Sequence, residues 1–385
     1  MAKILPARGH RVRWILQSDS PLREPRKVRW HGSDVFLLPS KTRNSLPEKV
    51  LDWIPRAFNT IRCFNRLVKI ERPDIIQIRN DWISGLWALR IRRKYGIPFV
   101  FQYSRPGPGY HLQRAQKASL TSRLGLIFRG RLENRLVHRI LRQADHVLPI
   151  SEWMKEALAA WGIPDDRMTP FPLGFNIDVS PDKVSGSRIR EKYGLGRVPV
   201  VLYFGELARF RKLDFLLRTI KLVIQKIPQT KLLIVGGSER SGDVASLKKE
   251  AEELGLKDQV IFTGKVPREE IPEYIVASDV GVSPIPPIPI YWISSPTKLI
   301  ETMGMARAAV ANDIPEQKAV LEESGAGLCV PYEEQAFAEA ILSLLRSPEL
   351  ARKMGLKGRR YVENKRSYQD MAGKLENIYL SLVSR

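Results

Sequence analysis

Short apolar runs alternate with longer amphipathic runs along this chain, and the alternation occurs in both halves. The apolar runs have the length of strands, and the amphipathic runs have the spacing of helices. Strands that alternate with helices form βαβ units and parallel sheets. The sequence therefore predicts an α/β fold in which two doubly wound, Rossmann-like domains with parallel sheets face each other across a cleft. Ligands of such sheets bind beyond the carboxyl ends of the strands.

The two series of apolar runs set the predicted domain boundaries. The first series lies at residues 11–17, 74–80, 98–104 and 146–151, and the second at residues 198–205, 231–237, 259–265, 280–284, 308–313 and 327–331. A polar stretch with Pro and Gly, typical of a linker, separates the two series. The predicted parts are a first domain at 1–178, a linker at 179–188, a second domain at 189–360 and a terminal helix at 361–385.

The N-terminus is unusual for a doubly wound domain. Such a domain opens with a strand and a glycine-containing turn, whereas residues 1–12 have the pattern of a helix end that leads into the first apolar run. We therefore expect the first strand to be missing, because Met1 is an internal methionine of a longer reading frame or because the chain is a fragment. A domain with a shorter sheet is the alternative.

Positive charge is concentrated in the first half of the chain. Residues 1–180 hold 32 Lys and Arg against 15 Asp and Glu, whereas residues 181–385 hold 31 against 26. A positive half attracts anionic lipid, an anionic acceptor or nucleic acid, and a solvated basic surface without a partner is the alternative. The two cysteines cannot form a disulfide framework, and the apolar runs are too short to cross a bilayer. We expect a cytoplasmic protein, either soluble or peripheral on the inner face of the membrane.

Residues 281–303 carry the densest group of candidate ligand-binding residues. After a predicted strand and a proline-rich loop, Ser295 and Pro296 stand where the N-cap and the first residue of a helix belong. The free amides and the dipole of a helix N-terminus bind anions such as a diphosphate. Lys298 adds a positive charge, and Glu301, one turn later, can accept hydrogen bonds from a ribose diol. An ordinary capped core helix is the alternative.

Two other strand ends of the second domain carry residues suited to phosphate. A glycine turn at Gly205 precedes three basic residues at the predicted start of a helix: Arg209, Arg211 and Lys212. Such residues clamp phosphate oxygens. Gly236 and Gly237 end the next predicted strand and permit close backbone approach to a ligand. Surface charge and an ordinary turn are the alternatives for each feature alone, but one sheet would bring all three strand ends together.

In their order along the chain, these motifs resemble the family 4 (group 1) glycosyltransferases of the GT-B fold, in the SPxK-type variant of the donor-site motif. The second half carries the resemblance in FGELARFRKLDFLL, KLLIVGGSE, SPTKLIETM and AAVANDIPEQKAVLEESGAGLCVP, and the first half in PDIIQIRNDWISGLWALRIRRKYGIPFVF, ADHVLPISEWMKEAL and FPLGFN. The resemblance implies an acceptor-binding first domain, a second domain that binds a nucleotide-diphosphate sugar, and a terminal helix that crosses back toward the first domain.

The resemblance also assigns roles to the candidate residues. Glu301 would bind the ribose hydroxyls, and the backbone at Gly264 and Lys265 would lie beside the nucleobase. The residues expected around the diphosphate are Gly205, Arg209, Gly236, Gly237, Ser295, Pro296, Thr297 and Lys298. The catalytic charges, which would neutralise the leaving phosphate, are Arg211, Lys212 and Lys298.

The implied reaction is glycosyl transfer with retention of the anomeric configuration. Its transition state is oxocarbenium-like, with negative charge growing on the leaving diphosphate, so catalysis needs positive charge and amide dipoles there. We expect neither a bound metal nor a cofactor. Four positions depart from the family pattern: Ile293 replaces a glutamate, Glu206 an arginine, Ser104 a histidine that His111 could supply instead, and Ala308 a proline.

Residues 105–143 have the composition of a membrane-surface segment. They contain nine Lys and Arg, only one acid, Glu133, and interleaved Leu, Ile and Phe. A basic amphipathic segment lies in an anionic membrane interface, where lipid-linked acceptors reside. The expected partners are therefore a nucleotide sugar, a lipid-linked or glycan acceptor and an anionic membrane. The alternative is a helix whose apolar face packs on the sheet and whose basic face is solvated.

Three other functions stay open at this point. A nucleotide-sugar epimerase would need acid and base residues in the cleft, and none is obvious in the sequence. An inactive scaffold would keep the fold without the glutamate and histidine that contact the sugar. Nucleic-acid binding fits the charge alone, but no recognition motif accompanies it.

Overall fold

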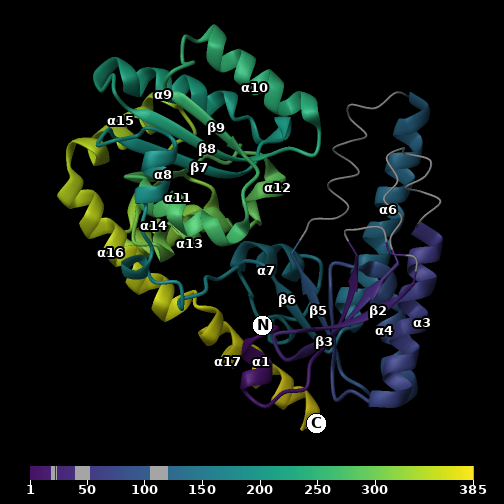
Figure 1. The fold of residues 1–385 in the computed structure, drawn as a ribbon. Helices are drawn as coiled ribbons and strands as arrows, with labels where there is room; N and C mark the ends of the chain where they lie inside the picture. Colours follow the sequence, from purple (N-terminus) through teal and green to yellow (C-terminus); the bar gives the residue numbers. More distant parts are fainter. Residues whose placement is uncertain (19–21, 23, 40–52, 105–119, 385) are drawn as a thin grey trace. The chain divides into compact units, whose positions relative to one another are not determined.

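A computed structural model of the protein describes residues 1–18, 22, 24–39, 53–104 and 120–384 (Figure 1). The chain divides into two compact units: unit 1 contains residues 1–171 and 371–385, and unit 2 contains residues 172–370. Both units combine helices with parallel strands, so the predicted α/β class is confirmed.

Unit 2 is built on a single six-stranded parallel sheet of order β12-β11-β10-β7-β8-β9. Its strands are β7 (Val200–Glu206), β8 (Lys231–Gly237), β9 (Val260–Gly264), β10 (Val280–Ser283), β11 (Ala308–Asn312) and β12 (Gly327–Val330). These are the six strands that the second half of the sequence predicts. The order reverses between β7 and β10, and ligands of such sheets bind in the crevice at the carboxyl end of a reversal point.

Helices cover both faces of this sheet because its strands are apolar on both sides. Along β7, Val201 and Tyr203 enter one buried cluster, whereas Val200, Leu202 and Phe204 enter the other. The helices are α8 (Ser187–Lys192), α9 (Asp214–Lys226), α10 (Ser241–Glu253), α11 (Ile271–Ala277), α12 (Pro289–Trp292), α13 (Thr297–Gly304), α14 (Pro315–Ser324), α15 (Glu334–Arg346) and α16 (Pro348–Lys365).

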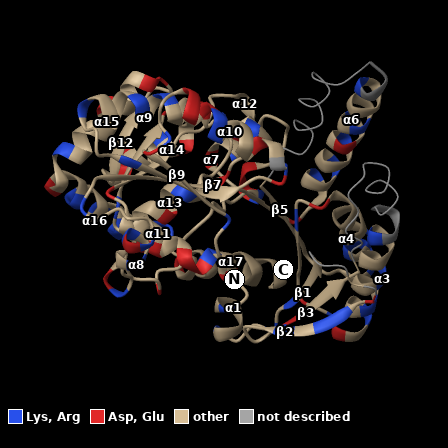
Figure 2. Ribbon diagram, turned by 45° about the horizontal axis from the view of Figure 1, so that its top comes forward, with Lys and Arg blue, Asp and Glu red and all other residues tan. Residues whose placement is uncertain are grey.

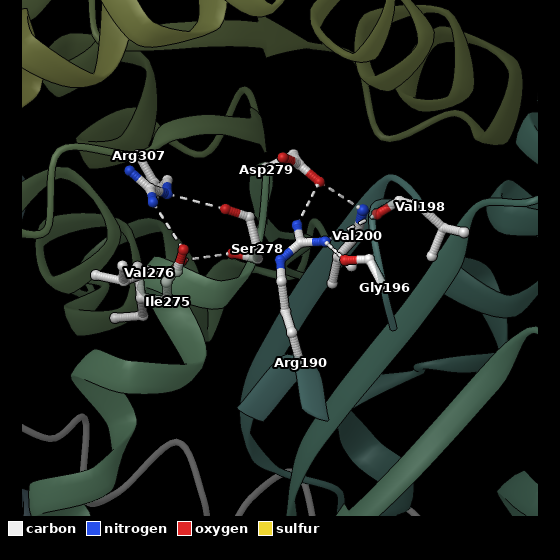
Figure 3. Close-up of polar contacts among 9 residues, drawn as sticks. All are labelled: Arg190, Gly196, Val198, Val200, Ile275, Val276, Ser278, Asp279 and Arg307. Carbon is white, nitrogen blue, oxygen red and sulfur yellow. Dashed lines mark hydrogen bonds and ion pairs between the residues drawn. The ribbon is translucent and has the colours of Figure 1, made fainter. Parts of the chain in front are cut away.

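Two arginines fix the amino ends of β7 and β10 (Figure 3). Arg190 of α8 donates to two loop carbonyls before β7 and pairs with Asp279 at 3.2 Å, and the same carboxylate accepts from the amide of Val200 at 2.7 Å. Arg307 donates to the carbonyl oxygen of Ser278 at 2.9 Å, just before β10. Because their amino ends are fixed, the neighbouring parallel strands β7 and β10 also end close together, at the carboxyl edge of the sheet.

The described residues of unit 1 form two separate three-stranded sheets. One has the order β1-β3-β2, formed by β1 (Arg13–Gln17), β2 (Arg26–Trp30) and β3 (Ser33–Leu38), in which only β2 is antiparallel. The other is parallel, formed by β4 (Ile76–Arg79), β5 (Phe99–Tyr103) and β6 (His146–Pro149). Within the described part of the chain, β1 and β4 each have one edge that pairs with no named strand.

The helices of unit 1 include a layer in which α4 packs on both α3 and α6. They are α1 (Ile4–Ala7), α3 (Trp53–Glu71), α4 (Trp82–Tyr95), α6 (Leu120–Gln143), α7 (Glu152–Ala159) and most of α17 (Tyr368–Val383). Local chemistry sets the ends of α4: the Asp81 side chain accepts from the amide of Ile83, and Gly96 ends the helix in the left-handed conformation.

The β2–β3 hairpin and α3 lie where the sequence analysis placed no element. His31 and Gly32 join the two strands, and both have positive φ, at 48° and 81°. A two-residue loop with two positive φ angles is the tight turn that matches strand twist. The short strands and the exposed side of β2 hide this hairpin from a search for long apolar runs.

The unit boundaries differ from the predicted ones because residues 172–179 are bound to unit 2. Phe175 packs against Gly304, and Arg359 of α16 donates to the carbonyl oxygens of Ile177 and Val179 at 2.9 Å. The first boundary therefore lies at residue 171 instead of 178. Residues 361–385 are not one helix, because the chain breaks between α16 and α17, where Phe175 forms a bridge with Ser367.

Candidate active site

Glycines at the ends of β7 and β8 bring two strand ends into direct backbone contact. Gly205 and Gly236 have φ of 135° and 136°, a region that side-chain-bearing residues rarely adopt. A Cβ on Gly236 would collide with the carbonyl oxygen of Gly205, and a Cβ on Gly205 would lie 2.9 Å from Cε of Lys298. Both positions therefore require glycine, and a lysine from α13 takes the space beside Gly205.

Lys298 lies among aromatic and charged groups at the reversal point of the sheet. Its ammonium is 4.7 Å from the ring centre of Tyr203, on β7. Desolvation by the surrounding protein, together with the positive charge of Arg211, lowers the pKa of Lys298 to about 7. An anion at this point would restore the charged form of the lysine.

Arg211 faces the same place from the turn that follows β7. It forms an ion pair with Glu206 at 3.3 Å, and its guanidinium lies 5.6 Å from the ring centre of Tyr291 and 5.2 Å from that of Phe210. The Nε atom of Arg211 is buried without a hydrogen-bond partner among the described residues. Arg211 is thus held by stacking, and it has unused hydrogen-bonding capacity.

Of the three basic residues in the turn after β7, Arg211 is the one directed toward Lys298. The predicted helix start is wrong here: Arg209–Arg211 form a 3-10 turn, Lys212 is left-handed with φ of 48°, and α9 begins only at Asp214. Arg209 and Lys212 are exposed. Of the two residues in this turn that the sequence offered for the leaving phosphate, Arg211 and Lys212, the geometry favours Arg211.

Glu301 lies one turn into α13 and is largely buried. Burial raises the pKa of its carboxyl group, and the positive charges of Arg268 and Lys298 oppose that rise. Arg268, which is 76% exposed, reaches the carboxylate at 3.3 Å. The sequence analysis missed Arg268, Tyr203 and Tyr291, because their roles depend on contacts between distant segments.

The start of α13 differs from the predicted one by one residue. Pro296 is the N-cap residue, the helix begins at Thr297, and no side chain caps it. Ser295 is buried and bonds elsewhere: its hydroxyl donates to Glu316 at 3.2 Å and accepts from the amide of Leu173 at 3.3 Å. The first amides of α13 are therefore left without a side-chain cap, as an anion site requires.

Gly264 and Lys265 lie at the end of β9, on the far side of β8. A Cβ on Gly237 would lie 2.9 Å from Cγ of Lys265, so the lysine stem lies over this glycine. Gly264 has a positive φ of 76°. The strand ends of β7, β8 and β9 and the start of α13 thus bring together most of the residues singled out in the second half of the sequence.

A smaller polar cluster lies at the carboxyl ends of β4 and β5 in unit 1. Asn80 has a positive φ of 60°, and its amide group donates to the Ser104 hydroxyl at 2.7 Å. The Ser104 amide donates back to the Asn80 side chain at 2.8 Å. Ser104, which the sequence motifs match to a histidine of the family pattern, is therefore held by Asn80. His111 lies outside the described residues.

Comparison with known proteins identifies the family of this chain. A family model described as "Glycosyl transferases group 1" matches residues 198–347, and one described as "Glycosyl transferase 4-like domain" matches residues 1–174. The chain belongs to the group 1 glycosyltransferases. The family that the sequence resembles is thereby confirmed.

Among its relatives in this family is a GDP-mannose-dependent alpha-(1-6)-phosphatidylinositol monomannoside mannosyltransferase of Mycolicibacterium smegmatis. The two are 32% identical over 149 residues, which is 38% of each chain. The aligned regions span only 38% to 63% of the lengths of six curated relatives.

Solved glycosyltransferases share the fold over nearly the whole chain. Sucrose-phosphate synthase from Thermosynechococcus elongatus matches with a TM-score of 0.78 at 22% identity, covering 100% of this chain and 92% of that one. Anabaena HepE in complex with UDP and glucose matches with a TM-score of 0.68 at 17% identity, covering 91% and 87%. The predicted GT-B class is confirmed.

Proposed function

We propose that this chain transfers a sugar, with retention of configuration, from a nucleotide-diphosphate donor to a lipid-linked or polysaccharide acceptor at the cytoplasmic membrane surface. One observation carries the proposal: Lys298, Arg211 and the uncapped start of α13 converge where the parallel sheet of unit 2 reverses its order. Half-buried positive charge beside free amides is what a diphosphate leaving group needs.

Each part of the donor has a proposed partner in this cluster. The amides of Thr297 and Lys298 and the ammonium of Lys298 would hold the diphosphate. Gly236 and Gly237 would let the backbone approach it, and Glu301 would release Arg268 to accept hydrogen bonds from the ribose. The nucleobase would lie beside Gly264 and Lys265.

Positive charge also accounts for the proposed catalysis. As the glycosidic bond to the diphosphate breaks, negative charge grows on the leaving oxygen, and Arg211 and Lys298 would stabilise it. These two charges would serve in place of a metal ion. Arg211 would exchange its contact with Glu206 for one with phosphate.

The nature of the acceptor rests on charge and on one relative. The M. smegmatis relative is named for transfer to phosphatidylinositol monomannoside, a lipid. The first half of this chain has the positive charge that an anionic membrane attracts. Within the described residues, none of the helices combines the length and the apolar character that spanning a bilayer demands.

A thermal-shift panel with UDP, GDP, ADP and dTDP sugars tests the donor site. A ligand at about a hundred times its Kd adds about 2.7 kcal/mol, which is a shift of several degrees. We expect a shift with one nucleotide that Glu301→Ala abolishes and that Glu269→Ala, an exposed neighbour, preserves. A folded protein that shifts with none of them would overturn the proposal in favour of an inactive scaffold.

A further inference from the structure

Three large apolar side chains form an exposed stripe on α6. Leu124, Phe128 and Leu132 are 72%, 71% and 45% exposed, and their spacing of four residues places them on one side of the helix. The buried side of the same helix carries other residues, among them Val137 and Ile140. Single exposed apolar residues are ordinary, but a continuous apolar patch marks an interaction surface.

The same side of α6 is basic beyond the stripe. Arg135, Arg139 and Arg142 follow Leu132 at intervals of three or four residues, and all three are exposed. Glu133 is the one acid in the described part of α6, and it is half-buried. On its exposed side, α6 is thus apolar in its first half and cationic in its second half.

This basic surface continues on α4, which packs on α6, and on α3, which packs on α4. Exposed cations on α4 and α3 are Arg90, Arg93, Lys94, Arg62, Arg66 and Lys69, and Figure 2 shows blue residues along all three helices. Two more apolar side chains of α3, Phe58 and Ile70, are 64% and 66% exposed. The acid at the end of α3, Glu71, lies 3.0 Å from Arg11 and 3.5 Å from Arg13, so its charge is compensated.

We propose that the α3–α4–α6 layer of unit 1 docks on an anionic lipid bilayer, with Leu124, Phe128 and Leu132 inserted among the headgroups. A lipid surface satisfies both features at once, since headgroups pair with the arginines and acyl chains take up the apolar stripe. This docking deepens the proposed function, because it names the surface that would bring the chain to a lipid-linked acceptor. Only the link to the acceptor rests on the proposed function, and the docking itself does not.

Vesicle flotation of the full chain tests the docking without any nucleotide sugar. We expect binding to phosphatidylcholine vesicles that contain phosphatidylglycerol and none to phosphatidylcholine alone. Leu124→Ser with Phe128→Ser should weaken binding at least tenfold, because the inserted side chains are lost. Arg135→Gln with Arg139→Gln should weaken it roughly thirtyfold. Leu356→Ser, at a site on α16 that is 45% exposed, should change nothing.

A depth measurement distinguishes insertion from contact by charge alone. Phe128→Trp should gain fluorescence that lipids with brominated acyl chains quench, beyond the quenching in the wild type. Because this substitution keeps an aromatic side chain, it also tests the proposal if the serine variant does not fold. Binding that survives the serine variant in full, or fluorescence of the Phe128→Trp variant that brominated lipid quenches no more than it does the wild type, would overturn the proposal.

Nucleic acid is the competing partner for the basic surface. Binding to duplex RNA or DNA that Arg135→Gln with Arg139→Gln weakens and the serine variant does not, in the absence of vesicle binding, would also overturn it. The nucleotide-induced thermal shift, measured on the same variants, should equal that of the wild type. Loss of that shift in every protein would count against the proposed function while vesicle binding still supports the docking.

Discussion

The two units place their charged residues in opposite ways. In unit 2, Lys298, Glu301 and Arg211 converge at the end of one continuous sheet. The surrounding protein lowers the pKa of Lys298, raises that of Glu301 and leaves the buried Nε of Arg211 unpaired among the described residues. In unit 1, most cations of α3, α4 and α6 are exposed to solvent, and the described strands form two smaller sheets. Converging charge suits a small anionic ligand, whereas dispersed charge suits an extended anionic surface.

The largest predicted effect concerns the buried ion pair that supports the start of α13. Glu316 is almost fully buried, accepts from Arg366 at 2.7 Å and also holds Ser295. Glu316→Ala leaves the arginine buried without its partner, so the free energy of unfolding should fall by about 3–5 kcal/mol. Guanidinium unfolding measures this, with exposed Glu322→Ala as the control. A loss under about 1 kcal/mol would show that the pair is dispensable.

The next prediction concerns the contact between the ends of β7 and β8. Gly236→Ala forces a Cβ onto the Gly205 carbonyl at a φ that alanine avoids, so it should cost about 2 kcal/mol and abolish nucleotide binding. Gly242→Ala, in α10 with open space around it, should be neutral or slightly stabilising. If Gly236→Ala and Gly242→Ala have the same free energy of unfolding and the same nucleotide affinity, the ends of β7 and β8 are not closely packed.

The pKa of Lys298 predicts how nucleotide binding depends on pH. The folded pKa of about 7 lies below the ordinary value of 10.5, so the lysine is largely neutral above pH 7 and must take up a proton to bind a diphosphate. Affinity should therefore fall up to about tenfold per pH unit between pH 7 and 9. Calorimetric titration measures this, and Lys298→Arg should bind with a flat profile. A flat wild-type profile would contradict the assignment.

The same lysine affects stability in the absence of ligand. Because its folded pKa is lowered, the unfolded chain binds more protons between pH 7 and 10.5, and this group alone makes stability rise with pH in that window. Lys298→Met should remove that contribution from the pH dependence of unfolding.

The smallest effect is expected in the hairpin of unit 1. Gly32→Ala places a Cβ at a positive φ of 81° in a surface turn with room around it, so it should cost about 1 kcal/mol. Nucleotide affinity should stay unchanged, because the turn belongs to the other unit. If the nucleotide affinity measured by titration changes in this variant, the two units do not act independently.

The contrast between the units also explains what the sequence could predict. The inner strands of unit 2, β7, β8, β10 and β11, are buried on both faces, so each is a continuous apolar run, and the ends of β7 and β8 fix where Gly205 and Gly236 meet. The β2 strand alternates Lys and Arg with Val and Trp, a pattern without such a run. The pairing of Arg268 with Glu301 and of Ser295 with Glu316 joins segments that are 33 and 21 residues apart, and no local pattern encodes such contacts.

Hydrogen–deuterium exchange with the nucleoside diphosphate that gives the thermal shift tests the central claim most directly. If unit 2 holds the donor at the reversal point, protection should appear in residues 203–207, 235–239 and 296–301. Unit 1, including residues 79–82, should exchange as it does without ligand. Protection confined to unit 1, or binding without protection at the start of α13, would contradict the account.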